Sequence, residues 1–451
     1  MSAWLHIIGV GEGGVHQLPT ALRDKLAEAT TVLGPARFIA EIEPMVRPRQ
    51  RTTPLNPDVV SAAGFDAIAR ALAGDGPDPV TPATGGDVRA LIEWESPLEA
   101  MIEQVLQRRD TPTVILASGD PMWFGIGATL ARHLMATEFA VHPYPSAFQL
   151  AASRLRWPMQ SITTLSLHGR PVELLHPHLM PSNRILALTS DRTTIDLVIE
   201  LLVDRGYGYS YLTTLENLGS PSERVTTGQA ADFLSDRIGD FYVLAIDCVP
   251  EVSAPMLPPL PGLPDDAFTS DGQLTKREVR AATLAKLAPF PGALLWDVGA
   301  GSGSVGIEWM RAMRDTKAIA FEKHNGRLQM IATNAAALGV PGLEIVAGDL
   351  PGTLDGRIPP DAVFLGGAVD DEDVFDACWQ ALKPGGRLVA NAVTVEGEQA
   401  LYERQQRLGG ELARIEVSVL DQIGQHRALR PRMAVTQWDV TKALHGVAQN
   451  G

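Results

Sequence analysis

A glycine-rich turn between an apolar stretch and an amphipathic stretch constrains this chain more than any other feature. Residues 294–298 are apolar except for Asp297, and Gly299, Gly301 and Gly303 follow at every second position. Glycine lets the backbone turn sharply and approach a ligand without a Cβ in the way. A strand, a glycine turn and a helix in this order are typical of cofactor sites in α/β proteins. The sequence therefore predicts a Rossmann-like domain around this turn.

The spacing of the glycines narrows the class of cofactor. Dinucleotide-binding turns have the pattern G-x-G-x-x-G and place a pyrophosphate at a helix N-terminus. Here the pattern is Asp-x-Gly-x-Gly-x-Gly, which resembles the S-adenosylmethionine (SAM) turn of Rossmann-like methyltransferases. SAM carries no phosphate, so the loop needs only to fit closely and to bind a zwitterion. Asp297 is expected to act through the loop backbone.

Length and composition exclude several classes of protein. With 451 residues, of which 45% are hydrophobic and 20% charged, two or three globular domains are expected. The net charge of −15 argues against a nucleic-acid binder, which usually shows a basic face. No apolar run reaches the roughly 18 residues of a membrane span, and no secretory signal is expected. Cys248 and Cys378 lie far apart, which argues against a disulfide framework and fits a cytoplasmic location.

A proline-rich segment divides the chain. Residues 250–264 contain six prolines and are predicted to form a stiff linker. It would join an N-terminal domain, residues 1–249, to a C-terminal domain, residues 265–451. Alternating elements in the C-terminal domain predict a parallel, doubly wound sheet with an antiparallel hairpin at one edge. The strands are expected at 293–298, 317–322, 343–347, 362–366, 387–391, 412–420 and 433–439, and the helices at 275–287, 304–314, 326–338, 371–382 and 396–408.

The N-terminal domain is also predicted to be α/β. Residues 49–95 are rich in proline, glycine and threonine, with one short helix-like run at 67–72, and most of this segment is expected to be an insertion or mobile loop. Strands followed by turns are predicted within 5–11 and 113–121, and further strands at 184–189 and 241–246.

Two acidic residues of the C-terminal domain follow predicted strands. Glu322 comes about 25 residues after Asp297, where Rossmann-type sites place an acid that binds the ribose hydroxyls. The alternative is a surface carboxylate. Asp349, followed by Leu350, occupies the position where such enzymes contact the adenine, or it caps the following turn.

Further candidates have two interpretations each. Gly366 and Gly367 end a predicted strand, where they either leave space for substrate or make a tight turn. Thr275 and Glu278 form a capping-box pattern, and the Thr275 hydroxyl also lies just before the predicted cofactor loop. The basic residues at 426–432 are either a solvated turn or an anion contact.

Three polar turns of the N-terminal domain contain Asp120, Ser146 and His168. No catalytic triad or metal-ligand spacing emerges from them, so no metal site is expected. His168 is either a loop histidine or a catalytic one. Local reasoning leaves these alternatives open.

The N-terminal turns carry a family resemblance. The domain resembles the tetrapyrrole methylase family, which implies a two-lobed fold, and the Ser-Leu-His-Gly-Arg string at 166–170 resembles the subgroup that acts on precorrin-6B. The matching segments are 8–11, 118–121, 145–151 and 166–170.

The C-terminal domain resembles the decarboxylating precorrin methyltransferases, on residues 262–268, 274–281 and 296–308. In this order, the two domains are similar to the fused enzymes of cobalamin synthesis. The resemblance covers nearly the whole chain, with a departure in the long segment 49–95, and it implies a homo-oligomer.

This resemblance implies one SAM per domain. In the N-terminal domain Gly9, Asp120, Ser146 and Ala147 would bind it, with His168 and Asp120 as catalytic candidates. In the C-terminal domain the site would comprise Thr275, Asp297, Gly299, Gly301, Gly303, Glu322, Asp349 and Leu350.

The reaction implied by the resemblance is methylation of precorrin-6B at C-5 and C-15, with loss of the ring C acetate as carbon dioxide, giving precorrin-8X. The N-terminal domain would methylate C-5; the C-terminal domain would methylate C-15 and decarboxylate. Because a methyl sulfonium is already electrophilic, catalysis should depend mainly on positioning. The substrate has many carboxylates, which need local cations. The candidates beside Gly366 and Gly367 are Arg170, Lys276, Arg277, Arg280, Arg427 and Arg430.

Two other functions stay open at this point. The C-terminal domain resembles tRNA adenine methyltransferases at fold level, although the overall acidity argues against nucleic acid. Alternatively, one domain is an inactive SAM-binding regulator.

Overall fold

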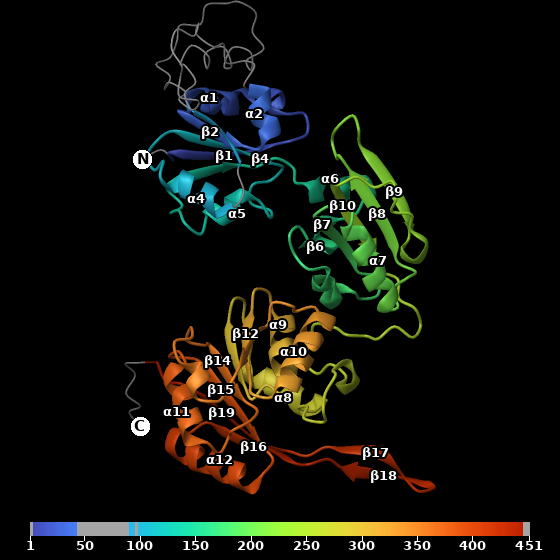
Figure 1. The fold of residues 1–451 in the computed structure, drawn as a ribbon, viewed down its shortest axis with the longest axis vertical. Helices are drawn as coiled ribbons and strands as arrows, with labels where there is room; N and C mark the ends of the chain where they lie inside the picture. The colour runs from blue at the N-terminus through green and yellow to red at the C-terminus, as the bar shows by residue number, and fades with distance from the viewer. Residues whose placement is uncertain (1–2, 43–89, 95–97, 445–451) are drawn as a thin grey trace, which may run out of the picture. The chain divides into compact units, whose positions relative to one another are not determined.

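The computed structural model describes residues 3–42, 90–94 and 98–444 (Figure 1). The chain is α/β throughout, and it divides into two compact units. In the parts of the chain that the structure describes, no helix is long and apolar enough to cross a membrane. The first unit comprises residues 1–169, 184–199 and 209–247, and the second comprises residues 170–183, 200–208 and 248–451.

The first sheet is entirely parallel, with the strand order β3-β2-β4-β1-β5. Successive residues of β1 face opposite sides, so Ile8 packs with α1 and α2, and Ile7 packs with α4 and α5. Figure 1 shows these helix pairs on the two faces of the sheet. The elements are β1 (Leu5–Val10), α1 (Thr20–Glu28), β2 (Thr31–Gly34), α2 (Ala36–Ile42), β3 (Ala90–Glu93), α4 (Leu98–Leu106), β4 (Thr113–Ser118), α5 (Ile126–Leu130) and β5 (Phe139–His142).

Strand β3 was not predicted from the sequence. It lies at the end of the segment 49–95, most of which was expected to be a loop, and its four residues pair in parallel with β2. The helix-like run at 67–72 and the rest of 49–89 lie outside the described residues.

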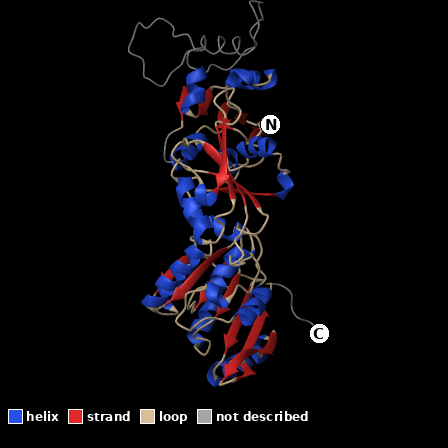
Figure 2. Cartoon of the chain, turned by 90° about the vertical axis from the view of Figure 1, so that its right-hand side faces the viewer, coloured by secondary structure: helices blue, strands red, loops and turns tan. Residues whose placement is uncertain are grey.

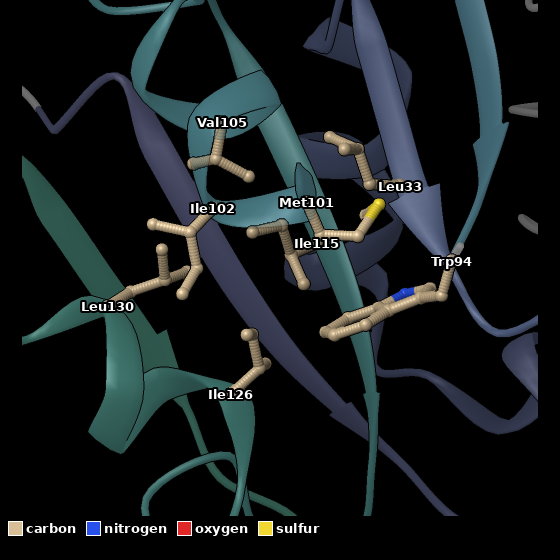
Figure 3. A pocket seen from close by; sticks show the side chains of 8 residues that line it. All are labelled: Leu33, Trp94, Met101, Ile102, Val105, Ile115, Ile126 and Leu130. Carbon is tan, nitrogen blue, oxygen red and sulfur yellow. The ribbon is translucent and has the colours of Figure 1, made fainter. Parts of the chain in front are cut away.

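A small apolar pocket lies within this first sheet's core (Figure 3). Only hydrophobic side chains line it, among them Leu33, Met101 and Ile115, with Trp94 at one side. It has no space for a water molecule, so it is a packing gap of the core rather than a ligand site.

The second sheet is mixed, with the order β6-β7-β10-β8-β9 and one parallel pair, β6 with β7. Phe148, Ala151 and Ala152 of α6 pack against it together with Leu186 and Val243. The elements are α6 (Ala147–Leu155), β6 (Ile162–Ser166), β7 (Arg184–Leu188), α7 (Thr194–Asp204), β8 (Tyr211–Glu216), β9 (Arg224–Gln229) and β10 (Tyr242–Asp247).

The third sheet has seven strands in the order β13-β12-β11-β14-β15-β19-β16. The first five are parallel, and β19 is antiparallel to both β15 and β16. The predicted doubly wound sheet with an antiparallel edge is confirmed. The strands are β11 (Leu294–Val298), β12 (Lys317–Glu322), β13 (Glu344–Ala347), β14 (Ala362–Leu365), β15 (Arg387–Ala392), β16 (Glu411–Ile415) and β19 (Val435–Thr441).

Helices cover both faces of this sheet (Figures 1 and 2). Leu295 faces a core that includes side chains of α8, α9 and α10, whereas Trp296 faces a core with α11 and α12. Central parallel strands are therefore apolar on both sides, as their near-continuous hydrophobic sequence predicts. The helices are α8 (Arg277–Leu287), α9 (Ser304–Ala312), α10 (Asn325–Ala337), α11 (Glu372–Ala381) and α12 (Val395–Leu408).

The closing region differs from the predicted two-stranded hairpin. Four strands are present, because β17 (Ser418–Ile423) and β18 (His426–Pro431) form a separate two-stranded ribbon between β16 and β19. The basic residues expected in a turn therefore lie mostly on a strand. Every ribbon residue except Ala428 is exposed, and Figure 1 shows the ribbon projecting from the third sheet.

The proline-rich segment contains no helix or strand, as expected. It is nevertheless more than a spacer, because Leu257 and Leu263 are buried in the core that includes α8, α9 and α10. The backbone N–H groups of Gly262 and Leu263 also donate to the buried Glu308 carboxylate, at 2.6 and 2.9 Å. Part of the segment is thus built into the second unit.

Candidate functional site

A cavity of about 810 Å³ opens at the carboxyl ends of the third sheet's strands. Its walls include Gly299 and Gly301 after β11, Glu322 at the end of β12, and Gly367 after β14. The strand order reverses between β11 and β14, which is where open α/β sheets bind ligands. The glycine turn that dominates the sequence therefore lies at the cavity.

The turn depends on glycine at specific positions. Gly299 and Gly301 have φ angles of +72° and +60°, a region that disfavours other residues. A Cβ on Gly299 would lie 2.8 Å from the backbone of Gly367. Gly303 also has positive φ, at +76°, but a Cβ there would meet Ile331 of α10 and not the cavity. Gly303 therefore serves packing, although it was expected in the cofactor site.

Glu322 fixes the loop through its carboxylate. Its Oε2 accepts from the backbone N–H of Gly301 at 3.0 Å, and its Oε1 accepts from those of Lys323 and His324 at 2.9 and 3.0 Å. A carboxylate has about four acceptor positions, so one remains for a ligand. Glu322 is buried but lines the cavity, which argues against the alternative of a surface carboxylate.

Asp297 lies beneath the loop and is not among the cavity-lining residues. Its Oδ2 accepts from the backbone N–H of Gly306 at 2.8 Å, in the first turn of α9. Burial raises the pKa of Asp297 to about 7, and the nearby charge of Glu322 adds to the increase. This residue positions the helix that follows the glycine turn.

The remaining strand ends complete the wall. Asp349 and Leu350 line the cavity after β13, and Gly366 lines it with Gly367 after β14. Gly366 and Gly367 both donate to the Val298 carbonyl, at 2.9 and 3.3 Å. They make a tight turn and also border the cavity, so both interpretations of this pair apply.

The predicted capping box before α8 is wrong. The helix begins at Arg277, its N-cap is Lys276, and no side chain caps it. Thr275 instead lines the cavity, as does Lys276, whereas Arg277 is not among the lining residues. Thr275 therefore borders the cavity and does not cap the helix.

Arg280 corrects the set of substrate cations. Its side chain is fully buried, with Nε 2.6 Å from Glu308 Oε1 and Nη1 3.3 Å from Asp265 Oδ1. It also donates to the carbonyls of Thr275 and Leu263. These contacts make Arg280 a structural residue that ties α8 to α9 and to the end of the proline-rich segment.

The ribbon arginines lie outside the cavity lining, with one exception. Arg427 and Arg430 are exposed on β18, and Arg430 Nη1 lies 3.0 Å from Asp421 Oδ2. Arg432, just after β18, lines the cavity and approaches Glu278 Oε2 at 3.2 Å. Sequence reasoning included Arg432 in the basic cluster but could not single it out.

In the first unit, candidate residues lie at the carboxyl ends of β1 and β4. A Cβ on Gly9 would lie 2.3 Å from the Gly119 carbonyl oxygen. Asp120 Oδ1 accepts from the backbone N–H of Met122 at 2.8 Å. Ser146 caps α6, which begins at Ala147, in a reciprocal capping box. Gly9 thus allows a close approach of two backbone segments, Asp120 stabilises its own turn, and Ser146 caps a helix.

His168 and Arg170 belong to the turn after β6. His168 Nδ1 lies 3.2 Å from the Thr189 carbonyl oxygen, and the backbone N–H of Gly169 donates to Ser190 at 2.9 Å. Arg170 is exposed. Within the described residues, no group of three or more His, Cys, Asp or Glu side chains could hold a metal ion.

Several cavity residues were missed from the sequence. Asn391 lines the cavity at the end of β15, and Val393 and Met433 line it with exposed apolar side chains. Asn391 could have been predicted as a cavity residue, because it lies at the end of a parallel strand whose neighbour is followed by Gly366 and Gly367. Met433 could not have been predicted, because its position depends on how the ribbon leaves the sheet.

Comparisons with known proteins fit this geometry. Residues 4–234 match the family model of tetrapyrrole (corrin/porphyrin) methylases, and residues 266–442 match a precorrin methyltransferase domain. The precorrin-6Y C(5,15)-methyltransferase [decarboxylating] of Sinorhizobium sp is 42% identical over 98% of this chain and 97% of that protein. The chain belongs to the precorrin-6Y C(5,15)-methyltransferase family. As a member of it, the chain is a SAM-dependent methyltransferase.

Further relatives cover either the whole chain or one part of it. The precorrin-6Y C(5,15)-methyltransferase [decarboxylating] of Mycobacterium tuberculosis is 35% identical over 97% of this chain and 99% of that protein. A probable cobalt-precorrin-6B C(15)-methyltransferase (decarboxylating) of Sulfurisphaera tokodaii is 30% identical over 36% of this chain and 85% of that protein. The predicted fusion of two methyltransferase domains is confirmed.

Proposed function

We propose that this chain methylates precorrin-6B at C-5 and C-15 and removes the ring C acetate as carbon dioxide, giving precorrin-8X in cobalamin biosynthesis. The observation that carries the proposal is the match along 97% of a relative named for both methylations and for decarboxylation. The cavity at the reversal of strand order supports it, because it is built from the turn and the acid that a SAM site needs.

The two activities are assigned to separate domains. Residues 265–451 would methylate C-15 and decarboxylate, residues 1–249 would methylate C-5, and residues 250–264 would join them. A relative named only for C(15) methylation and decarboxylation covers 36% of this chain, a share that fits one domain. The precorrin methyltransferase model matches residues 266–442, which supports placing that activity in the C-terminal domain.

The C-terminal cavity fits SAM. When bound, SAM supplies a methyl group on a positively charged sulfur. The remaining acceptor position of Glu322 would bind the ribose hydroxyls, and Asp349 with Leu350 would contact the adenine. Gly299, Gly301 and the Thr275 hydroxyl would border the rest of the cofactor. Asp297 and Gly303 would act indirectly, by supporting the loop.

A second SAM would bind in the N-terminal domain, near Gly9, Asp120, Ser146 and Ala147. The position of these residues at strand ends supports this. His168 and Asp120 are the catalytic candidates of this domain. We further propose that the enzyme needs no metal, is cytoplasmic and forms a homo-oligomer.

The chemistry depends on how the chain holds the substrate. Methyl transfer forms a carbon–carbon bond while the sulfur–methyl bond breaks, so the cavity must align the two reactants. In decarboxylation the bond to the carboxylate breaks, its electron pair enters the conjugated macrocycle, and a proton is then added at carbon. The candidate contacts for the substrate carboxylates are Lys276, Arg170, Arg277, Arg427 and Arg430.

Carbon dioxide release tests the proposal. The full chain, given precorrin-6B, should release carbon dioxide only when its C-terminal cavity is intact, and calorimetry should find two SAM molecules per chain. One SAM per chain would contradict the proposed SAM site in one of the two domains. Binding of tRNA in a gel shift, without carbon dioxide release, would contradict the proposed substrate.

A further inference from the structure

The cavity extends well beyond the proposed cofactor residues. Those residues lie at the ends of β11, β12 and β13, whereas other cavity residues belong to β15, β16 and β19. Four strand spacings separate β12 from β19 in the sheet order, which corresponds to about 19 Å. The far part of the cavity is therefore a separate wall, available to a second ligand.

This far wall is formed at the base of the β17–β18 ribbon. Ile415 and Val417 precede the ribbon, and Arg432 and Met433 follow it, and all four line the cavity. The backbone N–H of Arg432 donates to the Val417 carbonyl at 2.8 Å, so the two strands are still paired at this point. The ribbon thus holds its two base segments side by side against the cavity.

The far wall combines apolar side chains with a charged pair, Arg432 and Glu278. Met433 is 71% exposed and Val393, after β15, is 49% exposed, and clustered exposed apolar side chains mark binding surfaces. The Arg432 side chain is 36% exposed. A flat, largely apolar ligand with carboxylates at its rim would match this combination.

Arg432 already contacts two carboxylates, but these contacts do not use all of its N–H donors. Its Nη1 lies 3.2 Å from Glu278 Oε2 and 3.8 Å from Asp265 Oδ2. A guanidinium has five N–H donors, and ion pairs exposed to this degree are weak. A ligand carboxylate can therefore share or take over this guanidinium.

We propose that the base of the ribbon is the substrate-binding wall of the C-terminal domain, where Arg432 binds a substrate carboxylate in exchange for Glu278. This inference rests on the proposed function. It assigns recognition to the arginine at the base of the ribbon, rather than to Arg427 and Arg430 further along β18. Ile415, Val417 and Met433 contact the face of the macrocycle.

Arg432→Ala in the full chain tests this, with Arg357→Ala as the matched control. Arg357 has a similar exposure, 34%, and a similar ion pair, with Nη1 2.7 Å from Glu344 Oε1, but it does not line the cavity. Arg432→Ala should raise the KM for precorrin-6B in carbon dioxide release about tenfold or more. The Kd for SAM should change less than about twofold, and Arg357→Ala should change neither.

Two further variants test the exchange. Arg432→Lys should restore part of the affinity, because it keeps the charge but loses the paired donors. Glu278→Gln should lower the KM for precorrin-6B by about twofold or more, because it weakens the competing contact. The inference would be overturned if Arg432→Ala kept the wild-type KM for precorrin-6B, or if its affinity for SAM fell as much as its KM for precorrin-6B rose. An unchanged KM in Glu278→Gln would overturn it as well.

Direct titration of precorrin-6B, followed by its absorbance, separates this inference from the proposed function. If the wild-type chain binds precorrin-6B without releasing carbon dioxide, the proposed function fails, and the Kd of Arg432→Ala still decides the role of Arg432. If the wild-type chain does not bind precorrin-6B, both proposals fail.

Discussion

The Glu322 carboxylate accepts a hydrogen bond from the backbone N–H of Gly301, with 3.0 Å between Oε2 and nitrogen. This contact joins the end of β12 to the glycine turn after β11, so one side chain holds the loop and borders the cavity at once. Glu322 and Gly301, which lie 21 positions apart in the sequence, belong to a single site.

Glu322→Gln is expected to weaken SAM binding at the C-terminal site by about tenfold or more. The amide offers one oxygen where the carboxylate offers two, so acceptors for the loop and for the ribose hydroxyls are lost. Calorimetric titration with SAM measures this. Glu403→Gln, on the exposed face of α12, is the control, and an unchanged titration in Glu322→Gln would contradict the assignment.

Gly299→Ala should destabilise the chain more than Gly356→Ala does. The two glycines have nearly equal φ angles, +72° and +70°, but only a Cβ on Gly299 meets other atoms, the Gly367 backbone at 2.8 Å. Both variants lose about 1–2 kcal/mol from the left-handed conformation, and Gly299→Ala loses about 1–3 kcal/mol more from the collision. Urea unfolding compares them, and equal losses would show that the loop can move away from Gly367.

Arg280→Met should lower the free energy of unfolding by about 3–5 kcal/mol, because it leaves the buried Glu308 carboxylate without its cation. Arg277→Met, three residues earlier on the exposed face of α8, is the control and should cost less than about 1 kcal/mol. If Arg280→Met instead unfolds like the wild type while the KM for precorrin-6B rises, Arg280 is a substrate residue after all.

Asp297→Asn should make the stability of the chain less dependent on pH. The pKa of Asp297 is raised from 3.8 to about 7 in the folded state, so wild-type stability falls as pH rises from 3.8 to 7 and then levels off. Once Asp297 must ionise in the folded state, the wild-type free energy of unfolding is lower by about 4 kcal/mol. Asparagine avoids this loss, and its side-chain oxygen can still accept from the backbone N–H of Gly306.

Urea titrations at pH 5 and pH 8.5 measure this effect. The stability of Asp297→Asn relative to the wild type should increase by roughly 2–3 kcal/mol between the two pH values. Asp376→Asn, at an exposed position of α11, should show no such increase. A pH-independent difference for Asp297→Asn would mean that Asp297 ionises normally in the folded chain.

The central sheet was predictable because its signals are local. Strand β12 occupies Lys317–Glu322, the range expected from the sequence, since a short apolar run with β-branched and aromatic residues indicates a buried strand. The same locality explains the glycine turn, whose sequence alone demands an unusual backbone.

The sequence-based predictions are wrong where tertiary contacts determine the local structure. Thr275 and Glu278 match a capping box, but the helix starts at Arg277, and Thr275 lines the cavity instead of capping the helix. The ribbon strands β17 and β18 pair only with each other, which alternation of residues cannot show. Arg280 had a usable signal, because it is spaced like the buried Thr283, Leu284 and Leu287 on one face of α8.

The mass of the product tests the central claim most directly. The full chain is incubated with precorrin-6B and SAM carrying an isotopically labelled methyl group, and the tetrapyrrole is analysed by mass spectrometry. The proposed function predicts a product that has gained two labelled methyl groups and lost one carbon dioxide. A product with neither change, formed under conditions in which SAM binds, would contradict it.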